Sequence, residues 1–359
     1  MDAIVLVGGE GTRLRPLTYD VPKQMLPVVD RPMIEHVAAW LARHGIDRVV
    51  LSLGYRPDAF IEAFPSGEIE GARLCYAIEP ELLDTAGALR YAAESAGVDD
   101  TFVALNGDVL SDFDVTSLVA FHKDAGAEAT IQLTPVDDPS SFGVVPTSDD
   151  GRVLAFIEKP EPGTARTNMI NAGCYVLEPS VLARIAGDRR VSIERETFPL
   201  LVAAGSLYAA SSESYWLDTG TPAKYLQASL DILRGRRTPA SLPRCKEASP
   251  SVYVDPSATI RGQLGPSSYA GPGSVLRPGA VLESSVLSSG ALVAEGAVVR
   301  SSIVMEGAVV GPGAHVDSSI VGPGAVLGEG SQVAGFTVVG ASAEVPAGEV
   351  LDGARFPRP

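Results

Sequence analysis

A short loop near the N-terminus brings together the groups that bind phosphate in proteins. An apolar run over residues 3–7 leads into Gly8-Gly9-Glu10-Gly11-Thr12-Arg13. Its glycines allow backbone N–H groups to turn toward an anion, because no Cβ atom stands in the way. Arg13, Arg15 and Lys23 add the positive charge that a triphosphate requires, although a solvated surface charge explains Arg15 equally well. The loop lacks the Gly-Lys-Ser/Thr ending of a P-loop, so it predicts phosphate binding of another type.

Two aspartates follow apolar runs and have the chemistry of metal ligands. Asp108 ends the segment Asn106-Gly107-Asp108, and Asp218 lies in Tyr215-Trp216-Leu217-Asp218-Thr219-Gly220. Mg²⁺ is commonly held by one or two carboxylates together with substrate phosphates, so this pair would suffice. Capping of a turn is the alternative role for each aspartate.

The first 235 residues alternate short apolar runs with segments of helical periodicity. This alternation predicts a doubly wound α/β fold with parallel strands and helices on both faces. Ligands of such sheets lie beyond the carboxyl ends of the strands, which directs attention to the loops after residues 7 and 105. The predicted strands are 3–7, 48–53, 74–78, 101–105 and 129–136, and the predicted helices are 32–44, 84–96 and 115–125.

The C-terminal third repeats every 17 residues. Gly273, Gly290, Gly307 and Gly324 keep this spacing, and so do the Ser-Ser pairs that begin at 284, 301 and 318. Each unit divides into steps of six, six and five, which predicts a triangular coil with one short strand on each side and glycine at the corners. Stacked coils would bury one continuous core. The inward positions are Leu276, Leu282, Leu287, Val293, Val299, Val304, Val310, Val316, Val321, Leu327, Val333 and Val338.

The residue before each inward position points outward, and two sides of the coil are apolar there. One side carries Val275, Leu292, Val309 and Val326, and another carries Val286, Ile303 and Ile320. Strand propensity alone explains such residues. The competing hypothesis is that an apolar side packs on the N-terminal domain or on another subunit.

Bulk composition narrows the class of protein. The formal net charge of −16 opposes binding to nucleic acid and to anionic lipid. The 3 cysteines are far apart and show no metal-binding spacing, which indicates free thiols in a reducing compartment. No secretory leader or membrane-spanning stretch is evident, so we expect a cytoplasmic protein.

Several segments together resemble the sugar-1-phosphate nucleotidyltransferase family. The resemblance spans the N-terminal domain in order, and the repeats resemble the left-handed parallel β-helix that many members carry. It implies a Rossmann-like catalytic domain, which we place over residues 1–235. The stretch 234–251 is rich in Pro, Ser and charge and predicts a linker over 236–250, followed by a β-helix over 251–345 and a tail over 346–359. The matching segments are Gly8 to Thr18, Pro22-Lys23, Pro32-Met33-Ile34, Asn106-Gly107-Asp108, Phe142 to Val145, Phe156 to Pro160, Asn171-Ala172-Gly173 and Trp216 to Gly220.

The resemblance also implies roles for individual residues. Arg13 and Lys23 would bind the triphosphate, Asp108 and Asp218 would hold Mg²⁺, and Lys159 would bind the sugar phosphate. The sugar-1-phosphate oxygen would attack the nucleotide α-phosphorus in line and expel pyrophosphate. The implied nucleotide-binding set is Leu6, Val7, Gly8, Gly9, Gly11, Thr12, Arg13, Lys23, Glu79, Thr85, Ala86, Gly87, Asn106 and Asp108, and the sugar-binding set is Gly143, Glu158, Lys159, Asn171 and Gly173.

Within the family, residues 171–175 and 192–199 look most like mannose-1-phosphate guanylyltransferases. Glu79 matches a position near the base, where a carboxylate can accept from N1–H and the exocyclic amine of guanine. A surface charge before Pro80 is the alternative for Glu79. Two features depart from the subtype: the segment 23–27 resembles thymidylyltransferases, and Asp84 stands where glycine is common.

Other activities stay open at this point. Thymidylyl, uridylyl or adenylyl transfer to glucose-1-phosphate is the alternative reaction, and a catalytically silent regulatory homologue is the alternative role. Acyl transfer by the repeats is disfavoured, because their single histidine, His315, faces outward and no long loop interrupts the coils. We expect a homo-oligomer that binds an NTP and a sugar-1-phosphate, without nucleic acid or membrane partners.

Overall fold

The computed structural model describes residues 1–237 and 243–357. The chain forms two compact units, and each is discontinuous in sequence. The sheet unit joins residues 1–9 to 34–216, and the β-helix unit joins residues 10–33 to the chain from 217 onward. The domain boundaries expected at residues 235 and 250 stay predictions. Residues 238–242 of the expected linker and 358–359 of the expected tail lie outside the described residues.

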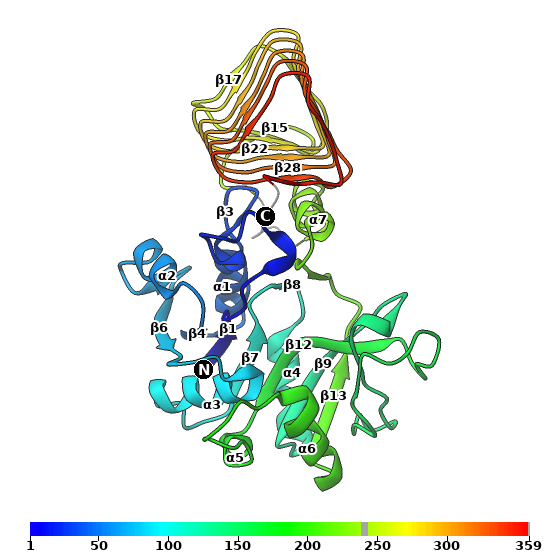
Figure 1. The fold of residues 1–359 in the computed structure, drawn as a ribbon. Coiled ribbons are helices and arrows are strands. Elements are labelled where there is room, and N and C mark those ends of the chain that lie inside the picture. The colour runs from blue at the N-terminus through cyan, green and yellow to red at the C-terminus, as the bar shows by residue number, and fades with distance from the viewer. Residues whose placement is uncertain (238–242, 358–359) are drawn as a thin grey trace. The chain divides into compact units, whose positions relative to one another are not determined.

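The sheet unit is built on a 10-stranded sheet whose central strands are parallel (Figure 1). The order along the sheet is β11-β10-β12-β7-β1-β4-β6-β5, and β9 and β13 extend it beside β12. Strand β12 runs antiparallel to β7, so the sheet is mixed on one side of its parallel centre. The bounds are β1 Asp2–Leu6, β4 Arg48–Leu53, β5 Glu68–Ile69, β6 Ala72–Ile78, β7 Phe102–Asn106, β9 Ala129–Pro135, β10 Gly143–Val144, β11 Ile157–Glu158, β12 Met169–Leu177 and β13 Leu207–Ser211.

Helices cover both faces of this sheet. The buried side chains of α3 and α6 form one hydrophobic cluster with β1, β4 and β7, while those of α1 and α4 lie outside that cluster. Helix α4 is capped at its N-terminus by Asp114, whose side chain accepts the Ser117 amide, and at its C-terminus by Gly126 in the left-handed conformation. The helices are α1 Met33–Arg43, α2 Pro57–Ala63, α3 Asp84–Ala96, α4 Val115–Ala125, α5 Pro179–Leu182 and α6 Phe198–Ala204, with a π-helix, η4, at Ile193–Thr197.

These elements confirm the expected α/β fold. Helices α3 and α4 have the predicted bounds, and β4 does too. Strand β6 begins two residues before the predicted 74. None of the described helices is long and apolar enough to cross a bilayer.

The β-helix unit consists of triangular coils whose three sides form three parallel sheets (Figure 1). The inward aliphatic residues from Leu276 to Val333 are buried as predicted. The inward position after Val333 is Val339, not the predicted Val338, because one extra residue follows Val333 at the turn of Gly335 and Phe336. Val338 instead pairs with Ile320 on the outward row.

In the regular coils, two corners are made by glycine and the third by serine. Gly290 and Gly307 both have φ of 64°, in the left-handed region where glycine is favoured. At the third corner Ser301 adopts φ of 44°, and the next serine, Ser302, is fully buried. The Ser302 hydroxyl donates to the Arg300 carbonyl at 2.6 Å and accepts the Ser319 amide at 3.0 Å. The serine pairs therefore form a hydrogen-bonded ladder between successive coils.

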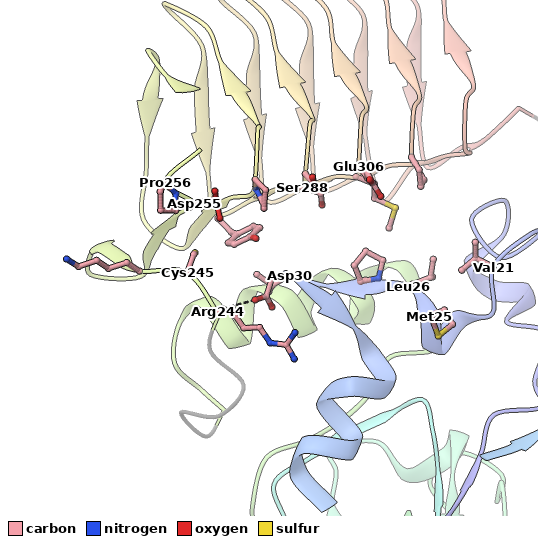
Figure 2. A pocket seen from close by; sticks show the side chains of 18 residues that line it. Val21, Met25, Leu26, Asp30, Arg244, Cys245, Asp255, Pro256, Ser288 and Glu306 are labelled. Atoms are coloured by element: carbon pink, nitrogen blue, oxygen red, sulfur yellow. Dashed lines mark hydrogen bonds between the residues drawn. The ribbon is translucent and has the colours of Figure 1, made fainter. Parts of the chain in front are cut away.

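One apolar side of the coil is covered within the β-helix unit. Val286, Ile303 and Ile320 are each 1% exposed, although they point away from the coil interior. The sheet that carries them faces helix α7 (Pro222–Leu233) and the β2–β3 hairpin (Pro27–Val28 and Arg31–Pro32) (Figures 1 and 2). This row is therefore packed against segments of the β-helix unit itself, and packing of a coil side on the sheet unit or on another subunit stays a prediction. Val326, on another side, is 40% exposed.

A cavity of about 660 Å³ lies between this sheet and the hairpin, wholly inside the β-helix unit (Figure 2). Leu26 and Asp30 line it from the hairpin side, and Tyr269 and Met305 line it from the coil. The Asp30 carboxylate accepts the Arg244 amide at 2.7 Å, which anchors the chain as it enters the coils. None of the residues expected to bind substrate lines this cavity.

The coils extend beyond their predicted end at residue 345. Strands β33 (Val350–Asp352) and β34 (Arg355–Phe356) pair in parallel with β30 (Gln332–Ala334) and β31 (Val338–Val339). The described part of the expected tail is thus a further coil. The glycine spacing fades there, which is why the sequence pattern did not reveal it.

Candidate active site

The carboxyl ends of three parallel strands lie level with one another in the sheet unit. Leu6 of β1 pairs with Ser52 of β4 on one side and with Asn106 of β7 on the other. The Gly107 amide donates to the Leu6 carbonyl at 2.9 Å, and a Cβ atom on Gly107 would lie 2.5 Å from Val7 Cγ1. Glycine is therefore needed at 107 for the loop carrying Asp108 to pack against the start of the phosphate loop.

Glu79 follows β6 and is held beside the phosphate loop. Its Oε1 accepts the Ser52 hydroxyl at 3.1 Å, and its Oε2 accepts the Leu83 amide at 3.1 Å. A Cβ atom on Gly8 would lie 3.4 Å from Oε1. Since each carboxylate oxygen accepts more than one hydrogen bond, this geometry orients Glu79 and leaves acceptor capacity for a ligand.

The turn that begins α3 is fastened to a distant segment. The amides of Ala86 and Gly87 both donate to the Val191 carbonyl, at 2.9 and 3.2 Å. The Thr85 amide donates to Asp84 Oδ1 at 2.8 Å. These N–H groups already have protein acceptors. A bound nucleotide would therefore make van der Waals contacts with this turn rather than hydrogen bonds to its amides. Asp84 has φ of 62°, which explains why glycine is common at this position.

The expected sugar-binding residues Asn171 and Gly173 form a bulge in β12. The Asn171 amide group donates to the Tyr175 hydroxyl at 2.9 Å, and its Oδ1 accepts the Gly173 amide at 2.9 Å. Gly173 has φ of 72°, and a Cβ atom there would lie 2.7 Å from Asn106 Nδ2. Burial first, and then the charge of Glu194, raises the pKa of Tyr175 well above its ordinary value. Tyr175 therefore stays a neutral hydrogen-bonding group.

Glu158 and Lys159 lie at the end of the same sheet. Glu158 pairs with Gly143 between β11 and β10. A Cβ atom at Gly143 would lie 3.1 Å from Glu158 Oε2 and 2.5 Å from the Phe156 ring. Lys159 Nζ is 3.7 Å from Glu158 Oε1, and the Lys159 side chain is 61% exposed. The lysine therefore presents its charge to solvent beside a carboxylate, where an incoming anion can reach it.

The rest of the phosphate loop belongs to the β-helix unit. Gly11 has φ of 63°, and its carbonyl accepts the Thr18 hydroxyl at 2.8 Å and the Leu14 amide at 2.9 Å. A Cβ atom on Gly11 would lie 3.1 Å from both Lys23 Cβ and Thr18 Cγ2. The loop is thus closed tightly around Gly11, and Lys23 lies against it.

Arg15 is held by its own loop. Its guanidinium donates to Glu10 at 2.8 Å and lies 5.4 Å from the centre of the Tyr19 ring. This arrangement favours the surface-charge explanation of Arg15.

Arg13 and Asp218 meet across Gly220 in the same unit. A Cβ atom on Gly220 would lie 2.4 Å from Arg13 Nη2 and 2.9 Å from Asp218 Oδ1. Asp218 Oδ1 accepts the Gly220 amide at 2.8 Å, which fixes the orientation of the carboxylate. The adjacent Thr219 hydroxyl donates to the sulfur of Met33 at 3.1 Å. The cation and the carboxylate predicted from distant sequence positions are therefore neighbours.

The predicted site residues thus assemble into two groups, one in each compact unit. The sheet unit holds the residues expected near the base, those expected near the sugar, and Asp108. The β-helix unit holds Gly11, Arg13, Lys23 and Asp218. Joint metal binding by Asp108 and Asp218 stays a prediction. Sequence reasoning did not single out Ser52, Tyr175 or Glu194, although the last two lie inside segments that carried the family resemblance.

Two family models match the chain. A nucleotidyl transferase model matches residues 2–235, and a GMPPB C-terminal domain model matches residues 286–356. The chain belongs to the nucleotidyl transferase family.

Relatives of this nucleotidyltransferase share most of its length. The mannose-1-phosphate guanylyltransferase of Mycobacterium tuberculosis is 40% identical over 296 residues, covering 81% of this chain and 80% of that protein. Mannose-1-phosphate guanylyltransferase 1 of Arabidopsis thaliana is 40% identical over 293 residues, covering 80% and 79%. HddC from Yersinia pseudotuberculosis, solved in complex with GMP-PN, has a TM-score of 0.55 at 28% identity and covers 64% of this chain and 97% of its own.

Nucleotidyltransferases generally use a divalent metal ion. No group of three or more His, Cys, Asp or Glu side chains clusters as a metal site within the described residues. The donors present fit a hard cation that takes one or two carboxylates and completes its shell with substrate phosphates and water. At Asp218, the amide contact on Oδ1 holds the carboxylate in one orientation.

Proposed function

We propose that this nucleotidyltransferase transfers a guanylyl group from GTP to mannose-1-phosphate and releases pyrophosphate. The names of relatives that are about 40% identical over most of the chain support both substrates. The observation that carries the choice of base is Glu79, whose carboxylate is oriented by Ser52 and Leu83 beside Gly8. A carboxylate in this setting accepts from N1–H and the exocyclic amine of guanine, a pair of donors that no other common base offers.

In the proposed reaction an oxygen of the sugar phosphate attacks the α-phosphorus of GTP. A new P–O bond forms while the bond to the β-phosphate oxygen breaks, and pyrophosphate leaves with that oxygen. Alignment and neutralisation of charge lower the barrier, so no nucleophilic side chain is needed. Mg²⁺, held by Asp108 and Asp218, would neutralise the phosphate charge when bound.

The charged side chains divide this work. Arg13 and Lys23 bind the triphosphate and stabilise the departing pyrophosphate. Lys159 binds the phosphate of the sugar substrate, and Glu158 accepts from its hydroxyl groups. Asn171 and Gly173 shape the sugar side, where the Asn171–Tyr175 hydrogen bond keeps the bulge rigid.

A substrate panel tests the proposal directly. Pyrophosphate release is measured with each of four NTPs against mannose-1-phosphate and glucose-1-phosphate. We expect GTP with mannose-1-phosphate to give the highest kcat/KM. Faster turnover of dTTP, UTP or ATP with glucose-1-phosphate would reverse the assignment, and no turnover with any pair would indicate a catalytically silent protein.

Two aspartate variants test the metal site. We expect Asp108→Asn and Asp218→Asn each to lower kcat by roughly 100-fold or more at fixed Mg²⁺, because an amide is a weaker ligand for a hard cation. Circular dichroism and thermal unfolding check that the fold is kept. Near-normal turnover in either variant would remove that residue from the metal site.

We also propose a homo-oligomer located in the cytoplasm. The partly exposed apolar row of the coil that ends in Val326 supports association, since apolar patches mark contact surfaces. Light scattering coupled to size-exclusion chromatography measures the mass in solution, and a monomer at all concentrations would contradict this proposal.

A further inference from the structure

A π-helix in the sheet unit carries a carboxylate that the proposed mechanism does not use. Helix η4 spans Ile193–Thr197 and is capped at its N-terminus by Ser192, whose hydroxyl accepts the Arg195 amide at 3.3 Å. π-Helices are rare and occur often at functional sites, because their wider turn re-aims side chains at a cost in helical stability. Here the wide turn directs Glu194, which is half-buried, toward the start of α3.

Thr85 is joined to Glu194 and to its neighbour Ile193 through one hydroxyl group. The Thr85 hydroxyl donates to Glu194 Oε2 at 2.9 Å, and the same hydroxyl accepts the Ile193 amide at 2.8 Å. The Ser192 hydroxyl donates to the same carboxylate oxygen at 2.8 Å. Hydrogen bonds to an ionised acceptor are the stronger kind, so this junction fixes Thr85 firmly.

The backbone reinforces the same junction. Val191 accepts the amides of Ala86 and Gly87, and its own amide donates to the Leu83 carbonyl at 3.0 Å. Residues 83–87 are therefore tied to residues 191–194 by both main-chain and side-chain hydrogen bonds. Leu83 is the residue whose amide orients Glu79. A continuous set of contacts thus runs from Glu194 through the Thr85 turn to the carboxylate proposed to read the base.

We propose that Glu194 is a positioning residue for guanine recognition. It holds the Thr85 turn so that the Leu83 amide keeps Glu79 at the angle needed to accept two hydrogen bonds from the base. Glu194 itself does not contact the nucleotide. This inference rests on the proposed role of Glu79, and it extends that role to a residue 115 positions away in the chain.

A residue that only stabilised the fold would give a different result from a positioning residue. Its loss would lower the stability of the protein and would reduce kcat/KM for every nucleotide alike. A positioning role predicts a selective loss, because only a base with both donors depends on the angle of Glu79. The ratio of kcat/KM for GTP to that for ITP measures the contribution of the hydrogen bond from the exocyclic amine, since the base of ITP keeps N1–H and lacks this amine.

The experiment measures this GTP/ITP ratio with mannose-1-phosphate in the full chain. We expect a wild-type preference for GTP of about tenfold or more, which Glu79→Gln lowers toward 1. We expect Glu194→Ala and Thr85→Val each to lower the ratio by about three- to tenfold, the value of one or two hydrogen bonds. The double variant should lose no more than the worse single variant, because both substitutions break one junction.

Matched variants distinguish a loss of base positioning from a loss of protein stability. Thr85→Ser keeps the hydroxyl and should restore the ratio. Glu196→Ala removes the neighbouring carboxylate of the same π-helix, which pairs at 2.6 Å with the exposed Arg189, and should leave the ratio at the wild-type value. If Glu194→Ala is too unstable to purify, Thr85→Val alone carries the test.

Two results would overturn the inference, and they differ in what else they remove. If Glu79→Gln lowers the ratio but Glu194→Ala and Thr85→Val reduce GTP and ITP use equally, Glu194 is structural and the proposed role of Glu79 stands. If Glu79→Gln leaves the ratio unchanged, Glu79 does not read the base, and both proposals fail.

Discussion

Gly11 in the phosphate loop and Gly307 at a corner of the β-helix have almost the same backbone conformation, with φ of 63° and 64°. Their surroundings differ. A Cβ atom on Gly11 would lie 3.1 Å from two neighbouring side chains, whereas one on Gly307 would meet no atom within 4 Å. The corner needs glycine only for the sake of φ. The loop needs it also because other parts of the site occupy the space, so the two regions should respond differently to the same substitution.

The largest effect on activity is expected at a glycine that is surrounded by side chains of the site but whose φ lies outside the left-handed region. In Gly220→Ala the new methyl group would meet Arg13 Nη2 and Asp218 Oδ1, and both side chains can move away because they are flexible and partly exposed. We expect kcat/KM to fall by about 100-fold through misplacement of these groups, with little change in the thermal unfolding midpoint.

Steady-state kinetics at several GTP concentrations, together with thermal unfolding, check this expectation. Gly307→Ala is the matched control for the added methyl group. Unchanged kinetics in Gly220→Ala would mean that Arg13 and Asp218 do not act on the substrates.

Gly11→Ala should affect both quantities. The positive φ costs an L-residue roughly 1–2 kcal/mol, and the methyl group would push on Lys23 and Thr18. We expect a fall in kcat/KM of about tenfold or more, and a measurable loss in the free energy of unfolding. A variant that loses stability but keeps the wild-type KM for GTP would show that the loop tolerates this shift and that Lys23 is placed by other contacts.

Gly307→Ala should change stability alone. The substitution carries the same cost in φ of roughly 1–2 kcal/mol and meets open space. We expect a lower unfolding midpoint for the β-helix with kcat and KM unchanged, measured by calorimetry and pyrophosphate release. Loss of activity in this variant would contradict the separation of the two regions, because it would couple a corner of the coil to catalysis.

The same contrast explains what the sequence could predict. The coil was predictable because one rule, an inward aliphatic residue every five or six positions, is repeated. The prediction was wrong where Gly335 and Phe336 lengthen a turn and move the inward position to Val339, and at the predicted end at residue 345, beyond which a further coil follows. The site was predictable where its functional residues are adjacent in the sequence, as in Gly8 to Arg13 or Asn106 to Asp108. Other contacts join residues that are far apart in the sequence. Ser52 and Glu79 are separated by 27 positions, and Thr85 and Glu194 by 109, so no local sequence pattern predicts these contacts.

The smallest effect is expected at the serine corners. Ser301 adopts φ of 44° without being glycine, so Ser301→Gly should relieve strain of roughly 1 kcal/mol in the folded state. Glycine also increases the entropy of the unfolded chain, which costs roughly 0.5–1 kcal/mol, so the two terms nearly cancel. We expect a change in the free energy of unfolding within about 0.5 kcal/mol of zero. A clear stabilisation would show that the strained corners are kept for the hydrogen-bonded ladder that begins at the next residue, Ser302, rather than for the stability of the turn itself.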